Sequence, residues 1–329
     1  MQDDMIPPHR HVDAQSVSDA ISILDEYGRR ATIIAGGTDE IEWLKNRSRD
    51  PEVVVDLKEI DELHGISERD DGGLRIGANT RLSEILESDL FTGGFSLIAD
   101  ATADVATPQI QYQGTIGGNL AQDSRCWYYR EDFDCYRAGG NTCYATTGDA
   151  REHAVTDYSR CITANPSDIA PALIALDAEV VIEGSRGERR QSVANFFVGP
   201  ETNITKMNTL GHREILKEII VPGTYADAAT YWEKARDRQA WDFALVNVAG
   251  VFAESGGSVS TARIVTNGIA PVPRRMRRAE SRIEGRSRNA DNAQEAADRI
   301  LSGADPFPTN EYKIPLAKNL VRNAIANAD

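Results

Sequence analysis

Two glycine-rich stretches decide the fold of this chain: Ala35-Gly36-Gly37-Thr38-Asp39 and Gly114-Thr115-Ile116-Gly117-Gly118-Asn119. Glycine lets backbone N–H groups approach a diphosphate without a Cβ in the way, and Thr and Asn side chains add hydroxyl and amide donors. Each stretch lies beside an apolar run, so the pair predicts a site that holds one dinucleotide from both sides. Neither matches G-x-G-x-x-G, so a Rossmann site is not supported, and either stretch alone could be an ordinary tight turn.

The residues around the first stretch predict alternating helices and strands. A helix is expected over Val17–Tyr27, with Ser16 as its N-cap and Gly28 as its end, followed by a short buried strand at residues 32–34. Further strands are predicted at residues 53–57, 74–78, 179–182 and 218–221, and further helices at Glu40–Lys45, 81–87 and 168–176. This mixture favours an α+β or α/β arrangement over an all-β sandwich.

The pattern changes after Pro222-Gly223-Thr224. Residues 230–235, 244–253 and 258–265 alternate like antiparallel strands, and two amphipathic helices at 291–301 and 314–326 close the chain. We therefore expect a first domain over residues 1–223 and a smaller C-terminal α+β domain over residues 224–329.

All four cysteines of the chain lie in one window between the second glycine-rich stretch and the helix at 168–176. They are Cys126, Cys135, Cys143 and Cys161. The window is rich in Tyr, Arg, Gly and Asp and poor in aliphatic residues, which is typical of an excursion loop. Four clustered cysteines in an intracellular chain favour a metal site over disulfides, and unrelated buried thiols would be scattered through the core.

The spacing of the cysteines leaves the metal open. Gaps of 8, 7 and 17 residues between positions 126, 135, 143 and 161 fit neither paired C-x-x-C knuckles nor a ferredoxin sequence. Zinc and a [4Fe–4S] cluster are both compatible with them. His153 lies inside the window, but with four thiolates available we expect it beside the ligands or in solvent.

Lys234 is the third candidate. It lies on a predicted strand, within Glu233-Lys234-Ala235-Arg236, where it could place one cation near a flavin ring or its phosphates. Judged by its sequence context alone, a solvated lysine on an edge strand is the simpler interpretation.

Composition limits the partners and the location. The formal net charge of −15 argues against nucleic acid as a partner, and the apolar runs are too short for a membrane span. Two acidic residues and two prolines in residues 1–10 do not match a signal peptide, so a cytoplasmic protein is expected. The low lysine content also suggests, as a hypothesis, a protein adapted to high salt.

Taken in order, these segments resemble the FAD-binding medium subunit of the xanthine dehydrogenase family of molybdenum hydroxylases, over nearly the full length. The matching elements are Ala35 to Asp39, Thr107-Pro108-Gln109-Ile110 leading into Gly114 to Asn119, Pro166-Ser167-Asp168, and residues 234–246. The resemblance implies a two-subdomain, PCMH-like FAD-binding fold followed by a smaller C-terminal domain, with FAD held noncovalently. By motif position, the cofactor-binding residues would be Ile34, Ala35, Gly36, Gly37, Thr38, Asp39, Thr115, Ile116, Gly117, Gly118, Asn119, Asp168 and Lys234.

The cysteine window is similar to that of a subset of this family, the aldehyde oxidoreductase and 4-hydroxybenzoyl-CoA reductase types, whose flavin subunits carry an additional [4Fe–4S] cluster. The sequence around Cys126 and Cys161 is closer to the aldehyde oxidoreductase type. The resemblance therefore implies that Cys126, Cys135, Cys143 and Cys161 ligate such a cluster.

The resemblance also implies the role of the chain. A large subunit with the molybdenum cofactor would oxidise the substrate, [2Fe–2S] clusters on a small subunit would relay electrons, and this flavin subunit would pass them to an external acceptor. Two alternatives stay open: a zinc-stabilised interaction subunit without redox activity, and a stand-alone flavin oxidoreductase. Partner subunits could also carry the chain out of the cytoplasm.

Overall fold

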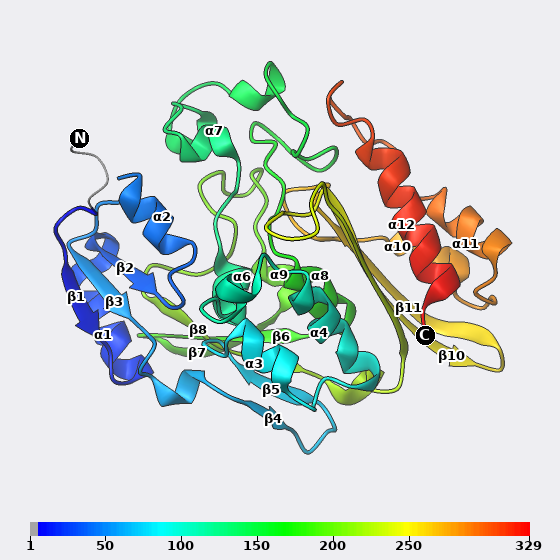
Figure 1. Ribbon diagram of the computed structural model, residues 1–329, viewed down its shortest axis with the longest axis horizontal. Helices are drawn as coiled ribbons and strands as arrows, with labels where there is room; N and C mark the ends of the chain where they lie inside the picture. Colours follow the sequence, from blue (N-terminus) through cyan, green and yellow to red (C-terminus); the bar gives the residue numbers. More distant parts are fainter. Residues whose placement is uncertain (1–5) are drawn as a thin grey trace.

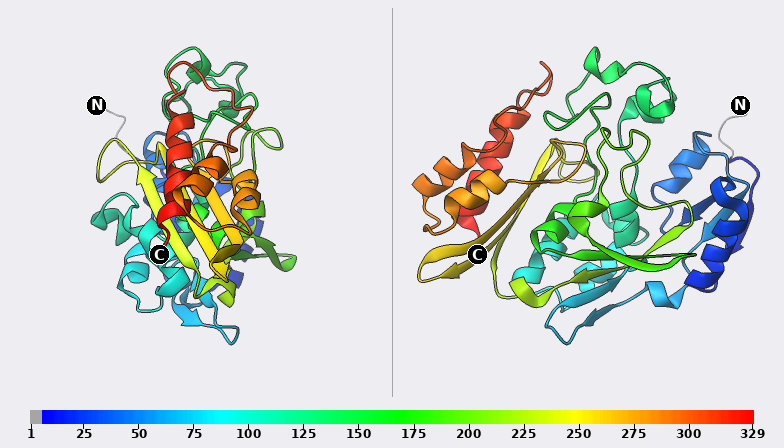
Figure 2. Two further views of the ribbon diagram at one scale, coloured as in Figure 1. Left: turned by 90° about the vertical axis from the view of Figure 1, so that its right-hand side faces the viewer. Right: turned by 180° about the vertical axis from the view of Figure 1, so that it is seen from behind.

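A computed structural model describes residues 6–329, and these fold into helices and strands arranged around three sheets (Figures 1 and 2). The sheets follow one another along the chain with strand orders β1-β3-β2, β4-β5-β8-β6-β7 and β12-β11-β10-β9. The predicted mixed α+β fold is confirmed. No helix within residues 6–329 is long and apolar enough to cross a membrane.

The N-terminal sheet is parallel and has its most buried strand in the middle. Its strands are β1 (Arg10–Asp13), β2 (Ala31–Ile34) and β3 (Val53–Asp56), and its helices are α1 (Val17–Tyr27) and α2 (Glu40–Lys45). Helix α1 has the predicted bounds because the Ser16 side chain accepts a hydrogen bond from the Asp19 N–H, and Gly28 ends the helix at a positive φ of 56°. Its apolar face packs on β3 through Val17, Ile21 and Leu24.

The second sheet is antiparallel and forms the centre of the molecule. It comprises β4 (Ile66–Glu68), β5 (Leu74–Gly77), β6 (Glu179–Gly184), β7 (Gly187–Ser192) and β8 (Glu214–Val221). The helices packed with it are α3 (Leu82–Glu87), α4 (Ser96–Ala103), α5 (Pro108–Gln111), α6 (Ile116–Ala121), α8 (Ile169–Ala175) and α9 (Val193–Phe196). Helix α8 is buried along its whole length, so it lies at the middle of this core.

The C-terminal part is an antiparallel sheet with helices on one face. Its strands are β9 (Ala229–Ala235), β10 (Val246–Ser255), β11 (Ser258–Asn267) and β12 (Arg274–Arg275), and its helices are α10 (Arg277–Ile283), α11 (Ala290–Ala297) and α12 (Lys313–Asn327). Figure 1 shows α10, α11 and α12 on the outer side of β10 and β11, while α8 packs on the same two strands from the central unit. The chain leaves the second sheet at Val221 and enters the third at Ala229.

The cysteine window is an excursion loop, as predicted. It contains α7 (Trp127–Arg130) and two 3-10 turns, Tyr136–Ala138 and Tyr144–Thr146, around a small core of Tyr128, Ala145, Ala150 and Ile162. The loop extends beyond the sheets, on the side of the molecule where α12 begins (Figures 1 and 2). Asn310, just before α12, donates from Nδ2 to the carbonyl oxygens of residues 150, 153 and 154, and so fastens the loop to the C-terminal unit.

Candidate functional site

The two glycine-rich turns touch each other. The first joins β2 to α2 and the second joins α5 to α6. A Cβ added to Gly36 would lie 1.9 Å from the Gln113 carbonyl oxygen, and one added to Gly117 would lie 2.7 Å from the Ala78 carbonyl oxygen. These two glycines are therefore required for the close approach of backbone to backbone, which differs from the expected role of leaving room for a ligand.

A large cavity of ≈ 620 Å³ opens beside these turns, within the volume range of roughly 300–1,000 Å³ that is usual for ligand and cofactor sites. Six of the predicted cofactor-binding residues lie on its wall: Thr38, Asp39, Thr115, Gly118, Asn119 and Asp168. The other seven do not line it: Ile34, Ala35, Gly36, Gly37, Ile116, Gly117 and Lys234. The structure thus brings both turns and the start of α8 to one cavity.

The two turns differ in the hydrogen-bonding capacity that they leave free. In the second turn the amide N–H groups of residues 116 and 117 donate to the carbonyls of residues 80 and 78, and that of Gly118 donates to Thr115 Oγ1. In the first turn, no hydrogen bond within residues 6–329 uses the amide N–H of Gly36, Gly37 or Thr38. The first turn therefore has unused amide donors at residues 36–38 for an anionic group, whereas in the second turn only the Thr115 N–H is unused within residues 6–329.

Asn119 retains a side-chain donor. Its Oδ1 accepts a hydrogen bond of 2.6 Å from Ser167 Oγ, which orients the amide and leaves Nδ2 as a donor at the cavity wall. Ser167 directly precedes Asp168, so this bond ties the second turn to the start of α8.

Asp39 anchors the cysteine loop to the first turn. Its Oδ1 lies 2.7 Å from Arg130 Nη2 and 3.1 Å from Arg125 Nη2, while Oδ2 accepts the Asp123 N–H at 3.1 Å. Burial opposes ionisation of the carboxyl, but the two guanidinium charges and these hydrogen bonds outweigh it and lower the pKa of Asp39 below its usual value. The loop and the cavity wall are thus joined by a charged network, which Glu42 completes on the other side of both arginines.

Lys234 is buried and lies behind Asp168. Its Nζ lies 2.7 Å from Asp168 Oδ2 and also donates to the carbonyl oxygens of Asp104 and Asp242, at 2.9 and 2.8 Å. Asn247 Nδ2 donates to the other Asp168 oxygen at 3.1 Å. The interpretation of Lys234 as a solvated residue is wrong: β9 is an edge strand, but this side chain is 0% exposed because it faces α8.

A second, smaller cavity lies within the cysteine loop. All four cysteines line it, together with Tyr128, Tyr129, Tyr136, Arg137, Tyr144, Ala145, His153, Arg160, Ile162 and Thr163. Each cysteine is free of disulfides. Burial raises the pKa of the Cys126 thiol to about 12 and also raises that of Cys161, so these groups ionise readily only when a metal ion takes the place of the proton.

The two cavities share a wall. Cys126, His153 and Thr163 line both of them, while Cys135, Cys143 and Cys161 line only the smaller one. Across this wall, His153 Nε2 lies 3.2 Å from Cys126 Sγ. Cys126 is thus the cysteine of the four that connects the two sites.

The site contains residues that sequence reasoning missed. Arg125 and Arg130 lie on the wall of the large cavity, and their positions one residue before and four residues after Cys126 were the available signal. Trp241 and Phe243 also line it and are 59% and 42% exposed. Trp241 has a positive φ of 58° and donates its N–H to the Ala106 carbonyl at 2.9 Å on the cavity wall, a backbone contact that no local pattern predicts.

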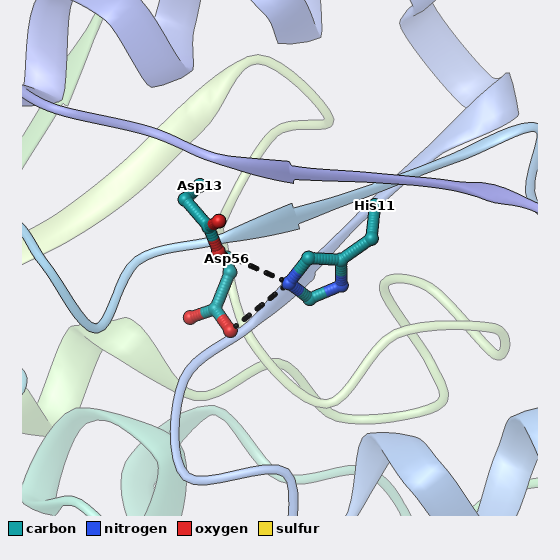
Figure 3. A group of neighbouring side chains, drawn as sticks. All are labelled: His11, Asp13 and Asp56. Carbon is teal, nitrogen blue, oxygen red and sulfur yellow. Dashed lines mark hydrogen bonds and ion pairs between the residues drawn. The ribbon is translucent and has the colours of Figure 1, made fainter.

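A separate polar group on the N-terminal sheet does not form a site. His11 Nε2 lies 3.1 Å from Asp13 Oδ1 and 3.4 Å from Asp56 Oδ2 (Figure 3). Lys58 Nζ lies 2.6 Å from the same Asp56 oxygen, so the buried carboxylate already has a cation. These are ordinary ion pairs of a strand end.

Comparisons with known proteins cover nearly all of the described chain. A family described as FAD binding domain in molybdopterin dehydrogenase matches residues 8–224, and one described as CO dehydrogenase flavoprotein C-terminal domain matches residues 230–328. The aldehyde oxidoreductase FAD-binding subunit PaoB of Escherichia coli (strain K12) is 30% identical over 302 residues, which are 91% of each chain. The carbon monoxide dehydrogenase medium chain of Hydrogenophaga pseudoflava is 29% identical over 98% of this chain and 97% of its own.

Solved structures agree with the sequence comparisons. A carbon monoxide dehydrogenase structure from Hydrogenophaga pseudoflava superimposes with a TM-score of 0.77 at 28% identity, over 98% of both chains. The fold and these matches define the flavoprotein component of an oxidoreductase. The chain belongs to the FAD-binding medium subunits of the molybdenum hydroxylase family.

Proposed function

We propose that this subunit works as an electron relay within a heteromeric molybdenum hydroxylase. It would collect electrons from [2Fe–2S] clusters on a small partner subunit and pass them to an external acceptor, while a large subunit with the molybdenum cofactor oxidises the organic substrate. Its own two redox groups would be FAD and one additional [4Fe–4S] cluster. The observation that carries this proposal is the shared wall between a cofactor-sized cavity and a cavity lined by four free cysteines.

The residues of the large cavity suit FAD. Of the unused amide donors of the first turn, that of Thr38 belongs to a residue on the cavity wall and would bind the diphosphate, and Thr38, Thr115 and Asn119 would add side-chain hydrogen bonds. Asp168, fixed by Lys234 and Asn247, would contact the cofactor from the start of α8. When bound, the flavin lets electrons that arrive singly leave as pairs. Lys234 would act through Asp168, since it does not reach the cavity wall itself.

The four cysteines suit a cluster better than zinc. A tetrahedral zinc site with Zn–S bonds of about 2.3 Å gathers its sulfurs to roughly 3.8 Å from one another. Within residues 6–329, no three cysteine sulfurs lie within 4.8 Å of one another. A [4Fe–4S] cluster places its four thiolates on four separate irons around a larger body, and soft thiolates match iron. The lack of a compact set of sulfurs within residues 6–329, together with the single cavity that all four cysteines line, supports Cys126, Cys135, Cys143 and Cys161 as cluster ligands.

A stand-alone flavin oxidoreductase has less support. Such an enzyme needs a base that can take a proton from its substrate. The histidine that lines the large cavity, His153, is 4% exposed and is turned towards Cys126, and burial lowers its pKa to about 4. The organic substrate would instead be chosen by another subunit. We place the complex in the cytoplasm, with export alongside a partner as the alternative.

The test is an absorption spectrum with iron, zinc and flavin quantitation on the whole complex, purified without air. We expect flavin bands, a broad iron–sulfur shoulder, and about four irons in this subunit beyond those of the small subunit. Cys135→Ser should remove these irons and leave the flavin, because Cys135 lines only the smaller cavity. Ser22→Ala, on the exposed face of α1, is the matched control. Zinc in place of the extra iron would overturn the cluster, and a complex without FAD would overturn the relay.

A further inference from the structure

His153 lies at the junction of the two cavities and contacts a cysteine directly. Its Nε2 is 3.2 Å from Cys126 Sγ, and the residue is 4% exposed. Its second ring nitrogen, Nδ1, is buried and has no hydrogen-bond partner within the described chain. A buried nitrogen without an acceptor is a poor place for a proton, since a buried N–H without a partner carries the full desolvation penalty.

The ring proton therefore belongs on Nε2, facing the sulfur. A metal-bound thiolate is an acceptor only, so the contact at 3.2 Å must then be an Nε2–H···Sγ hydrogen bond. Protonation at Nδ1 would place the lone pairs of Nε2 and of the thiolate against each other. Both arguments, from the unpartnered Nδ1 and from the sulfur, give the same tautomer.

The protein backbone fixes the imidazole in this position. The His153 N–H donates to the Ala150 carbonyl at 2.9 Å, and Asn310 Nδ2 donates to the His153 carbonyl at 3.3 Å. The ring centroid lies 6.3 Å from that of Tyr128, in the small core of the loop. The donor is thus held towards Cys126 by contacts that involve no metal ligand.

We propose that His153 donates an Nε2–H hydrogen bond to the Cys126 thiolate and thereby raises the reduction potential of the centre that the four cysteines hold. This inference rests on the proposed [4Fe–4S] cluster. A reduced cluster carries one more electron than an oxidised one, so its thiolates are more basic and are stabilised more by a hydrogen-bond donor. His153 is a positioning residue in this role, because it acts through Cys126.

The position of Cys126 between the two cavities means that this hydrogen bond would affect electron transfer between the cluster and the flavin. Cys126 is the ligand on the wall of the FAD cavity, so electrons that pass between the cluster and the flavin would use this side. A donor that stabilises the reduced cluster makes it hold an electron more firmly against the flavin. His153 would therefore set how one electron is distributed between the two redox groups.

The test is a redox titration of the purified holo complex, followed by visible absorption and electron paramagnetic resonance, with iron quantitation on each sample. We expect His153→Leu to lower the cluster potential by an amount equal to about a tenfold change in electron distribution, which is ~59 mV for a one-electron couple. His153→Gln retains an N–H donor and should recover part of this shift. His212→Leu, at an exposed histidine that lines neither cavity, should leave the potential unchanged.

The possible outcomes distinguish a failure of this inference from a failure of the proposed [4Fe–4S] cluster. Equal potentials in the natural protein and His153→Leu, with full iron in both, would overturn the role of His153 and leave the cluster in place. Absence of the extra iron from the natural protein would overturn the cluster itself. If His153→Leu loses its iron, pulsed resonance on the reduced natural complex with nitrogen-15 histidine decides: a coupling to one imidazole nitrogen and its exchangeable proton supports the bond, and its absence overturns it.

Discussion

Gly36 lies against Gln113 so closely that a Cβ on the glycine would come within 1.9 Å of the Gln113 carbonyl oxygen. The two residues belong to turns that are 77 positions apart in the numbering (113 − 36) and that approach the same cavity from two units of the fold. The two turns can therefore approach this closely because residue 36 has no side chain.

Replacing Gly36 with alanine should separate the turns and weaken FAD binding. The neighbouring atoms are backbone, which cannot move aside as a flexible side chain would, so we expect a loss of stability of about 1–3 kcal/mol together with a lower ratio of flavin to protein. Flavin absorbance after gel filtration and thermal unfolding measure the two effects. Gly187→Ala, in the hairpin between β6 and β7, has a positive φ of 98° and no nearby atoms. It should lower stability and leave the flavin ratio unchanged; equal flavin loss in both variants would contradict this explanation.

Asp168→Asn should strongly destabilise the fold. It leaves the ammonium of Lys234, whose side chain is 0% exposed, without its counter-charge, and breaking one side of a buried pair typically costs about 3–5 kcal/mol. Chemical denaturation measures the change. The double variant Asp168→Asn with Lys234→Met should recover much of the loss, because no buried charge remains. Asp237→Asn is the control, since its pair with Arg151 is half exposed and should contribute at most about 1 kcal/mol.

Lys313 should make stability depend on pH above neutrality. Burial disfavours its ammonium and lowers its pKa to about 7, from an ordinary value of 10.5. Between these pH values the unfolded chain holds a proton that the folded chain lacks, so the free energy of unfolding rises by about 1.4 kcal/mol per pH unit and falls again as the pH is lowered towards 7. Denaturation series from pH 7 to 10 should show that Lys313→Met loses this slope and Lys318→Met, on the same helix, keeps it. An unchanged slope in Lys313→Met would refute the assignment.

Asn310→Ala should loosen the cysteine loop without disturbing the flavin. One buried amide serves three loop carbonyls, and buried carbonyls without a donor each carry a penalty of about 1–3 kcal/mol. We expect faster proteolysis within residues 120–165 and lower iron content at unchanged flavin content. Asn292→Ala, at a partly buried position on α11 that makes no contact with the loop carbonyls, is the control and should keep the loop as in the natural chain.

Where local signals were complete, the sequence predicted the structure closely. Helix α1 has its predicted bounds because its cap at Ser16, its apolar face and its terminating Gly28 all lie within the segment itself. Strand β8 begins four residues before the predicted 218, at Glu214. Two of the four added residues, Glu214 and Lys217, are polar and pair with Arg189 and Glu183, distant partners that sequence periodicity cannot reveal. The predicted domain boundary at 223 stays a prediction.

The sequence predicted residues of the site only where they belonged to a recognisable motif. Six residues of the predicted set line the cavity, but the burial of Lys234 depends on Asp168, 66 residues earlier, and could not be read from its strand. The contact between Cys126 and His153 spans 27 residues of irregular loop. Glycine is needed at position 36 because the Gln113 backbone, from a distant part of the chain, lies against it. Such relationships arise from tertiary packing, which local patterns do not encode.

The hydrogen bonds from Asn310 to the cysteine loop also imply that the loop becomes fixed late during synthesis of the chain. The cysteines leave the ribosome well before residue 310, and until the segment before α12 follows, the loop carbonyls lack the donor that holds them in the finished protein. The loop of the growing chain is therefore held less firmly than that of the completed one. If the four thiols hold the proposed cluster, its delivery would be easiest before residue 310 is made, and formation of the Asn310 hydrogen bonds would be a late step of assembly.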